Sequence, residues 1–120
     1  MRNKTLIGVD IVEFARVERM KQEPFASRIL SDQEKAIYDK MEHPRRRLEF
    51  LAGRFALKEA YTKANRAFDT KLNMNEVTIL WDDEGAPVLR SPYRPQDEVQ
   101  VTLSHSEHYV VAFCMIIRGD

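Results

Sequence analysis

The chain has 120 residues, of which 43% are hydrophobic and 32% charged, as expected for one domain over residues 1–120 rather than two domains or a disordered tail. Nineteen Lys and Arg residues balance nineteen Asp and Glu residues, so long-range attraction does not favour a general polyanion binder. The single cysteine, Cys114, excludes an intrachain disulfide framework, and no stretch approaches the ~20 apolar residues of a membrane span. We therefore expect a cytoplasmic protein with neither nucleic-acid nor membrane partners.

The first half of the chain predicts one strand followed by helices. Residues 6–12 are apolar and β-branched, as in a buried strand, and the apolar residues of 14–20 then recur at helical spacing. A capping-box pattern at Ser31 predicts a helix to about residue 41. The longest predicted helix, 44–66, begins with a proline and has none inside it. Its predicted buried stripe consists of four apolar residues: Leu48, Leu51, Ala52 and Phe55.

The second half changes to the alternating period of strands. Four strands are expected, separated by turns at 83–85 and 91–95: residues 76–81, 87–90, 99–103 and 109–117. The last of them is apolar on both faces, so it needs cover on both sides, from the helices or from another subunit. A helical first half and a mostly antiparallel second half predict an α+β fold.

Two carboxylates stand where the patterns call for apolar residues. Asp10 interrupts the first strand and shares a strand face with Gly8 and Val12. Glu59 follows Phe55 by one helical turn, so the helix directs it to the side that carries its core. A buried carboxylate is costly unless it is paired, capped or bound to a metal ion. These two residues are therefore the first candidates for a functional site.

Each carboxylate also has a purely structural interpretation. Asp10 is a residue type that caps helices and forms turns. Glu59 and Lys63 are spaced as an ordinary i, i+4 surface ion pair, worth only ~0.5 kcal/mol. Polar and basic residues form a neighbouring row at helical spacing: Arg54, Lys58 and Thr62.

His105 lies between Ser104 and Ser106 at the end of a predicted strand. A Ser-His nucleophilic pair is disfavoured, because adjacent strand residues point to opposite faces. The histidine either helps to bind a phosphate or is structural. The run Arg45–Arg47 supports an RNA-binding interpretation only weakly; a solvated first helical turn is the simpler explanation. Together the carboxylates, the cations and the Ser-His-Ser segment describe a Mg²⁺ and polyphosphate site.

Three blocks of sequence resemble a known family. They are Gly8–Val12 with Glu13 and Arg16, then FLAGRFALKEAYTKA at Phe50–Ala64, and Val101–Tyr109. In this order and spacing they are similar to the holo-[acyl-carrier-protein] synthases, the small phosphopantetheinyl transferases of fatty acid biosynthesis. The resemblance implies Mg²⁺-dependent transfer of the phosphopantetheine arm of coenzyme A (CoA) to a serine of apo acyl carrier protein, with release of adenosine bisphosphate. It also implies a homotrimer with active sites at subunit interfaces. The competing hypothesis is a non-catalytic carrier- or nucleotide-binding module of the same fold.

The resemblance also implies a role for each candidate residue. Asp10 and Glu59 match the metal ligands, and Lys63 matches the cation on the scissile pyrophosphate. Glu59, directly or through a metal-bound water, is the candidate acceptor of the serine proton. Arg16 and Arg28 are expected to meet an acidic helix of the carrier. Five residues match positions that bind CoA: Arg54, Lys58, Thr62, His105 and Ser106.

The chain departs from the family pattern at two places. Residues 65–71 contain no glycine where most relatives have a Gly-Thr-Gly-Ile loop. Glycines there would allow close backbone approach, so their absence predicts a higher KM for CoA. Pro24 replaces a basic residue often found before Phe25, which predicts altered recognition of the carrier.

Overall fold

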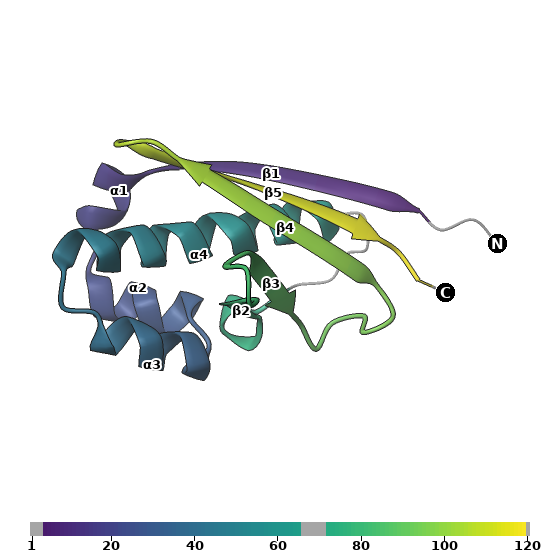
Figure 1. Ribbon diagram of the computed structural model, residues 1–120, viewed down its shortest axis with the longest axis horizontal. Helices are drawn as coiled ribbons and strands as arrows, with labels where there is room; N and C mark the ends of the chain where they lie inside the picture. The colour runs from purple at the N-terminus through teal and green to yellow at the C-terminus, as the bar shows by residue number, and fades with distance from the viewer. Residues whose placement is uncertain (1–3, 66–71, 120) are drawn as a thin grey trace.

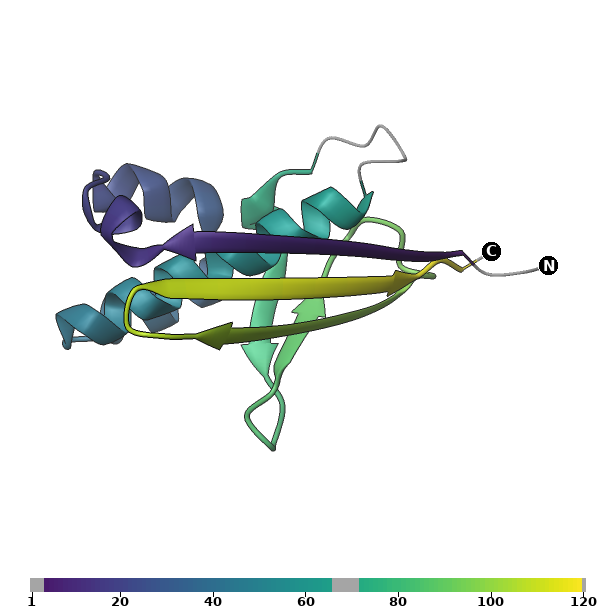
Figure 2. The same cartoon turned by 90° about the horizontal axis from the view of Figure 1, so that it is seen from above.

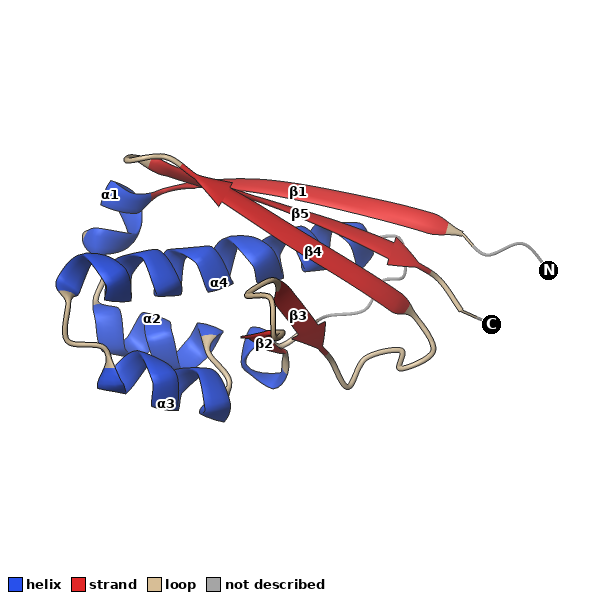
Figure 3. Cartoon of the chain, viewed as in Figure 1, coloured by secondary structure: helices blue, strands red, loops and turns tan. Residues whose placement is uncertain are grey.

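The computed structural model describes residues 4–65 and 72–119, and it has the predicted α+β fold (Figures 1 and 3). Its helices are α1 (Phe14–Glu18), α2 (Gln22–Ile29), α3 (Asp32–Lys40), α4 (Pro44–Asn65) and the 3₁₀ turn η2 (Met74–Glu76). Its strands are β1 (Thr5–Glu13), β2 (Thr78–Trp81), β3 (Pro87–Arg90), β4 (Glu98–His105) and β5 (Tyr109–Ile117). No helix in these ranges is both long enough and apolar enough to span a membrane.

The elements form three layers, with α4 in the middle (Figure 1). A three-stranded antiparallel sheet of order β1-β5-β4 covers one side of α4. On the other side lie α2, α3 and the β2–β3 hairpin, which is a separate two-stranded sheet. This central position explains why α4 has buried residues on all of its sides, from Leu48 to Asn65. Both outer layers therefore pack on the long helix.

The register of the sheet determines which side chains face α4. β1 and β5 pair from Thr5–Ile117 to Glu13–Tyr109, and Asp10 lies opposite Ala112. Along β1 the inward residues are Leu6, Gly8, Asp10 and Val12, as the strand periodicity predicted. The strand prediction is therefore confirmed, including the face that carries Asp10.

β1 crosses α4 at Gly8. A Cβ atom added to Gly8 would lie 2.1 Å from the Ala60 carbonyl oxygen and 2.8 Å from the Ala64 amide nitrogen. Only a residue without a side chain allows the two backbones to approach this closely. The crossing therefore depends on a glycine in the strand and on small alanines in the helix.

Several local expectations need correction. The sequence did not predict α2, because Pro24 and the charged residues around it conceal the buried Phe25, Ala26 and Ile29. The strand expected from residue 76 begins at Thr78, since Met74–Glu76 forms η2. Phe55, assigned to the buried stripe, is only partly buried. The capping box at Ser31 is present, with Glu34 as its partner.

The outer face of the three-stranded sheet is apolar and uncovered by any described residue (Figure 2). Ile7, Val9 and Ile11 are 65%, 55% and 64% exposed. Next to them on β5, Tyr109 and Phe113 are 45% and 39% exposed. The sequence predicted that β5 needs cover on both faces; within one chain, α4 supplies only one.

Candidate active site

The crossing of β1 and α4 brings two of the three predicted catalytic residues into direct contact. Lys63 on α4 donates a hydrogen bond from Nζ to Asp10 Oδ1 at 2.8 Å and another to the Val9 carbonyl at 3.2 Å. Asp10 is largely buried, with a side-chain exposure of 13%. The carboxylate in the apolar strand is thus neither a helix cap nor a turn residue; it faces the helix and pairs there.

Glu59, one turn before Lys63, completes the cluster. Burial raises the pKa of the Glu59 carboxyl, and the nearby Asp10 carboxylate raises it further. Lys63 and Arg16 act in the opposite direction and lower this pKa. All four groups are therefore close enough to interact, and two carboxylates share one partly buried site, an arrangement that a bound cation stabilises.

The donor set of this cluster fits Mg²⁺. The described ranges, 4–65 and 72–119, hold no group of three or more His, Cys, Asp or Glu side chains that could enclose a metal ion. Asp10 and Glu59 supply hard oxygen ligands but do not form a protein cage. Mg²⁺ is typically held by one or two carboxylates together with waters and substrate phosphates.

A cavity of about 310 Å³ borders Glu59. Its lining residues come from α2, α4 and the segment before β2: Arg28, Ile29, Phe55, Glu59, Leu72, Asn73, Met74 and Asn75. Arg28, predicted to contact a carrier, is exposed at its rim and lies over the Phe25 ring at 5.6 Å. The cavity combines apolar walls with amide side chains, next to the carboxylate cluster.

A second cavity, of about 340 Å³, lies beside α4 near the β4 edge of the sheet and contains Arg46, Arg54 and His105. The Arg54 guanidinium is 4.4 Å from the Phe50 ring and 4.7 Å from the Trp81 ring. Its Nε donates to the Ile79 carbonyl at 3.0 Å, whereas its Nη2 is buried and finds no acceptor among the described residues. Burial lowers the pKa of Arg54 to about 10, so the group remains charged at neutral pH.

An unpaired buried guanidinium nitrogen is costly, so it marks a place where an anion would be bound favourably. His105 is exposed in the same cavity, edge-on to Phe14 at 6.0 Å. Its Nδ1 lies 3.3 Å from the backbone oxygen of Ser106, not near a serine hydroxyl. Ser106 Oγ accepts from the Tyr109 amide at 3.3 Å, in the turn from β4 to β5. These contacts agree with the rejection of a Ser-His nucleophilic pair.

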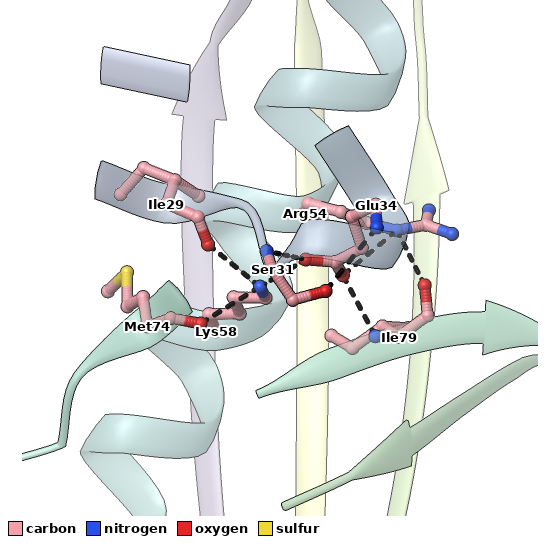
Figure 4. Close-up of polar contacts among 7 residues, drawn as sticks. All are labelled: Ile29, Ser31, Glu34, Arg54, Lys58, Met74 and Ile79. Carbon is pink, nitrogen blue, oxygen red and sulfur yellow. Dashed lines mark hydrogen bonds and ion pairs between the residues drawn. The ribbon is translucent and has the colours of Figure 1, made fainter. Parts of the chain in front are cut away.

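Lys58 and Thr62 do not share an open surface with Arg54. Lys58 is 1% exposed and donates to Glu34 Oε1 at 2.5 Å, to the Ile29 carbonyl at 2.8 Å and to the Met74 carbonyl at 3.0 Å (Figure 4). Thr62 Oγ1 donates back to the Lys58 carbonyl at 2.8 Å. Burial lowers the pKa of Lys58, and Glu34 partly opposes that shift. Arg54, Lys58 and Thr62 therefore do not act as one row. Lys58 belongs to a buried network, and Thr62 bonds to the helix backbone.

Glu34 is the member of this buried network that sequence reasoning missed. Its side chain is fully buried and also accepts from the Ser31 and Ile79 amides, both within 2.9 Å. The capping-box pattern explained only its contact with Ser31. No sequence signal indicated that the same carboxylate also pairs with Lys58 across 24 positions.

Arg45 and Arg47 contact their own chain rather than forming a basic patch. Arg45 pairs with Glu49 and lies over the Phe14 ring at 4.5 Å. Arg47 lies over the Tyr38 ring at 4.0 Å and donates to two carbonyls of the preceding segment.

Comparison with known proteins decides the family. The sequence profile of the 4′-phosphopantetheinyl transferase superfamily matches residues 6–114, nearly the whole chain. The chain belongs to this superfamily. The resemblance inferred from the sequence is thereby confirmed.

Two of its curated relatives carry the same name. The chain is 42% identical over 115 residues to holo-[acyl-carrier-protein] synthase from Geobacillus sp. (strain WCH70), covering 93% of this chain and 95% of that protein. It is 44% identical over 115 residues to the synthase of the same name from Anoxybacillus flavithermus, covering 93% and 94%. The fold superposes with a TM-score of 0.82 on a Bacillus anthracis holo-(acyl-carrier-protein) synthase in complex with CoA (3′,5′-ADP), at 33% identity and with 95% and 96% coverage.

Proposed function

We propose that this chain transfers the phosphopantetheine arm of CoA to a serine of apo acyl carrier protein and releases adenosine 3′,5′-bisphosphate. The location of the active site rests on one observation: Asp10, Glu59 and Lys63 cluster where β1 crosses α4. Relatives that share 42% and 44% of its residues are synthases of this activity. The reaction belongs to fatty acid biosynthesis, because acyl carrier protein is its acceptor.

Asp10 and Glu59 would hold Mg²⁺. When bound, the ion supplies charge neutralisation for the pyrophosphate oxygens as the bridging bond breaks. Asp10 is already paired with one cation, Lys63. Glu59 is a partly desolvated carboxylate, so a second cation beside it would stabilise its charged form. Both residues are therefore matched to a cation that keeps most of its other ligands from water and substrate.

The chain's own residues supply the remaining steps. Lys63, with a half-exposed side chain, reaches from α4 towards the pyrophosphate and stabilises the charge that develops on the leaving phosphate. Glu59 accepts the proton of the attacking serine, a role that its raised pKa favours over that of an unperturbed carboxylate. Arg54 and His105, with Ser106 in the adjoining turn, bind the nucleotide phosphates in the second cavity.

The active site is shared between subunits of a homotrimer. Asp10 and His105 both face the α4 side of the sheet, but from the opposite edge strands β1 and β4, and α4 packs between those edges. A CoA molecule that uses both halves is accommodated more simply between the β1 edge of one subunit and the β4 edge of the next. The uncovered apolar sheet face supplies the subunit contact that such an assembly needs.

The carrier approaches at the cavity rim. Arg16 and Arg28 are exposed on α1 and α2, on the side where Glu59 opens to solvent. Their charge would steer an acidic carrier helix and set its register. The free, buried Cys114 fits a reducing compartment, and we place the reaction in the cytoplasm. Of the glycine-free segment 65–71, only Asn65 lies within the described chain, so its predicted effect on KM stays a prediction.

The metal assignment is tested with Asp10→Ala and Glu59→Gln. Both variants should keep the wild-type circular dichroism spectrum and lose most turnover at saturating CoA and carrier, because each removes one of two protein ligands. Mg²⁺ should restore wild-type enzyme after treatment with EDTA. Near-normal rates in both variants would refute the assignment.

The shared site is tested by complementation between two inactive variants. Glu59→Gln disables the carboxylate half, and Arg46→Ala/His105→Ala disables the basic half. In randomly mixed trimers from co-expression, about a quarter of the interfaces pair two intact halves, so about a quarter of wild-type activity should return. Activity no greater than the sum of the two parents would show that each chain holds a complete site.

A further inference from the structure

We infer that Lys58 is a positioning residue: rather than touching CoA, it ties together two walls of the cavity beside Glu59, which receives the pantetheine arm of CoA. The inference rests on the proposed function, which supplies CoA as the substrate. It differs from the sequence expectation, in which Lys58 binds CoA directly. It also gives Glu34, which the sequence indicated only as a capping-box residue, a part in the reaction.

The first argument is the hydrogen-bonding capacity of Lys58. An ammonium group has three donors and no acceptor. In this structure the three are directed to Glu34 Oε1 at 2.5 Å, the Ile29 carbonyl at 2.8 Å and the Met74 carbonyl at 3.0 Å. With the residue 1% exposed, no donor is left to bind a phosphate.

The second argument is where these carbonyls lie. Ile29 is the last residue of α2 and Met74 is the first of η2, and both line the cavity that borders Glu59. Figure 4 shows the Lys58 ammonium between the two carbonyls, with Glu34 beside it. One side chain thus links the α2 wall to the η2 wall, from a position in α4 directly before Glu59.

Glu34 stabilises the buried Lys58 ammonium that makes this link. It balances the buried charges of Lys58 and of Arg54, whose Nε lies 3.8 Å from Glu34 Oε2, and it accepts from the Ser31 and Ile79 amides. A buried ammonium without such a partner would be strongly unfavourable. Glu34 therefore connects the cavity walls to α3 and to β2 at the same point.

The lining of the cavity indicates what it receives. Ile29, Phe55, Leu72 and Met74 are apolar, and Asn73 and Asn75 provide amide groups. The pantetheine arm is a chain of methylene groups interrupted by two amides, so the two surfaces match in kind. Since the cavity borders Glu59, an arm that begins at the reacting phosphate enters it directly.

The test uses Lys58→Met, which removes the ammonium and leaves the Glu34 carboxylate paired with Arg54 at 3.8 Å. The KM for CoA should rise about tenfold with a smaller loss of kcat, because the arm loses a preformed wall. Adenosine 3′,5′-bisphosphate, which lacks the arm, should inhibit Lys58→Met with the wild-type Ki. An unchanged KM for CoA would overturn the inference, and so would a Ki that rises in parallel with KM, because Lys58 would then bind the nucleotide phosphates.

The matched control is Arg47→Met. Arg47 is also a cation on α4 that donates to two carbonyls, those of Tyr38 at 2.8 Å and Met41 at 3.1 Å. It lies eleven positions before Lys58, roughly 16 Å along the helix axis. General loosening of the fold should affect both variants alike, whereas the inference predicts wild-type KM values in Arg47→Met. A matching rise in KM in the control would overturn it.

Leu72→Ala provides a second test that leaves the buried network intact. It enlarges the same cavity, so it should raise the KM for CoA and leave the Ki of the bisphosphate unchanged. If Leu72→Ala leaves both constants at wild-type values, the cavity does not receive the arm. Failure of the proposed function would be recognised separately, since wild-type enzyme and Arg47→Met would then show no transfer at all.

Discussion

Replacing Gly8 with alanine should both destabilise the fold and displace the catalytic carboxylate. The added Cβ would lie 2.1 Å from the Ala60 carbonyl oxygen, whereas ordinary contacts begin at 3.4 Å. The two backbones must therefore separate by more than 1 Å, taking the difference of these two distances. Neither side yields easily, because the clash is with main-chain atoms of α4 and β1 is hydrogen-bonded to β5 along its whole length.

Overpacking of this kind typically costs ~1–3 kcal/mol, and a clash with helix backbone places Gly8→Ala at the upper end, ~3 kcal/mol. For a domain of this size the melting temperature should fall by roughly 10 °C. Asp10 is two residues further along the strand and on the same face. A shift of ~1 Å relative to Glu59 and Lys63 should reduce kcat by about 100-fold.

The matched control is Gly53→Ala, in the interior of α4. There the added Cβ meets only Leu103 Cδ2, at 3.6 Å, which is an ordinary contact. Alanine is favoured over glycine in a helix by about 1 kcal/mol, so this variant should be as stable as wild type or more so. Urea unfolding at one fixed protein concentration compares the three proteins. A Gly8→Ala protein as stable as wild type would refute the close crossing of β1 and α4.

Three further predictions concern residues outside that crossing. Cys114 is fully buried, and burial raises its pKa to about 12, so the native thiol should resist iodoacetamide at pH 8 and react once the chain is unfolded; rapid labelling of the native protein would contradict this. Trp81 is the only tryptophan and faces Arg54 in the second cavity, so CoA should change its fluorescence saturably. A His105→Ala variant should need more CoA to reach half of this change. A fluorescence signal that does not respond to CoA would count against this cavity. Ile11→Asp places a charge on the uncovered sheet face, so light scattering should show loss of the trimer and of activity together; an intact trimer would place the subunit contact elsewhere.

The sequence predicted the parts of the molecule that depend on local periodicity. The alternation along β1 identified the face that carries Asp10, and helical spacing placed Glu59 and Lys63 on adjacent turns. The contact between Asp10 and Lys63 was not predicted, because it depends on how β1 crosses α4.

Local periodicity does not predict contacts between residues that are far apart in the sequence. Lys58 belongs to the same helical row as Arg54, but its direction is decided by Glu34 and by carbonyls of α2 and η2, which lie far away in the sequence. The helix α2 was missed because its stability comes from packing Phe25 and Ile29 rather than from local propensity. Tertiary contacts thus decided both a fold element and the role of a site residue.

The central claim is that Asp10 and Glu59 enable a metal-dependent transfer from CoA. The most direct measurement is the intact mass of apo acyl carrier protein after incubation with CoA and the wild-type chain, with Mg²⁺ or with EDTA. We predict a gain of one phosphopantetheine arm with Mg²⁺, no gain with EDTA, and almost none for Glu59→Gln in Mg²⁺. An unchanged carrier mass in Mg²⁺, or an equal gain in EDTA or with Glu59→Gln, would contradict the account.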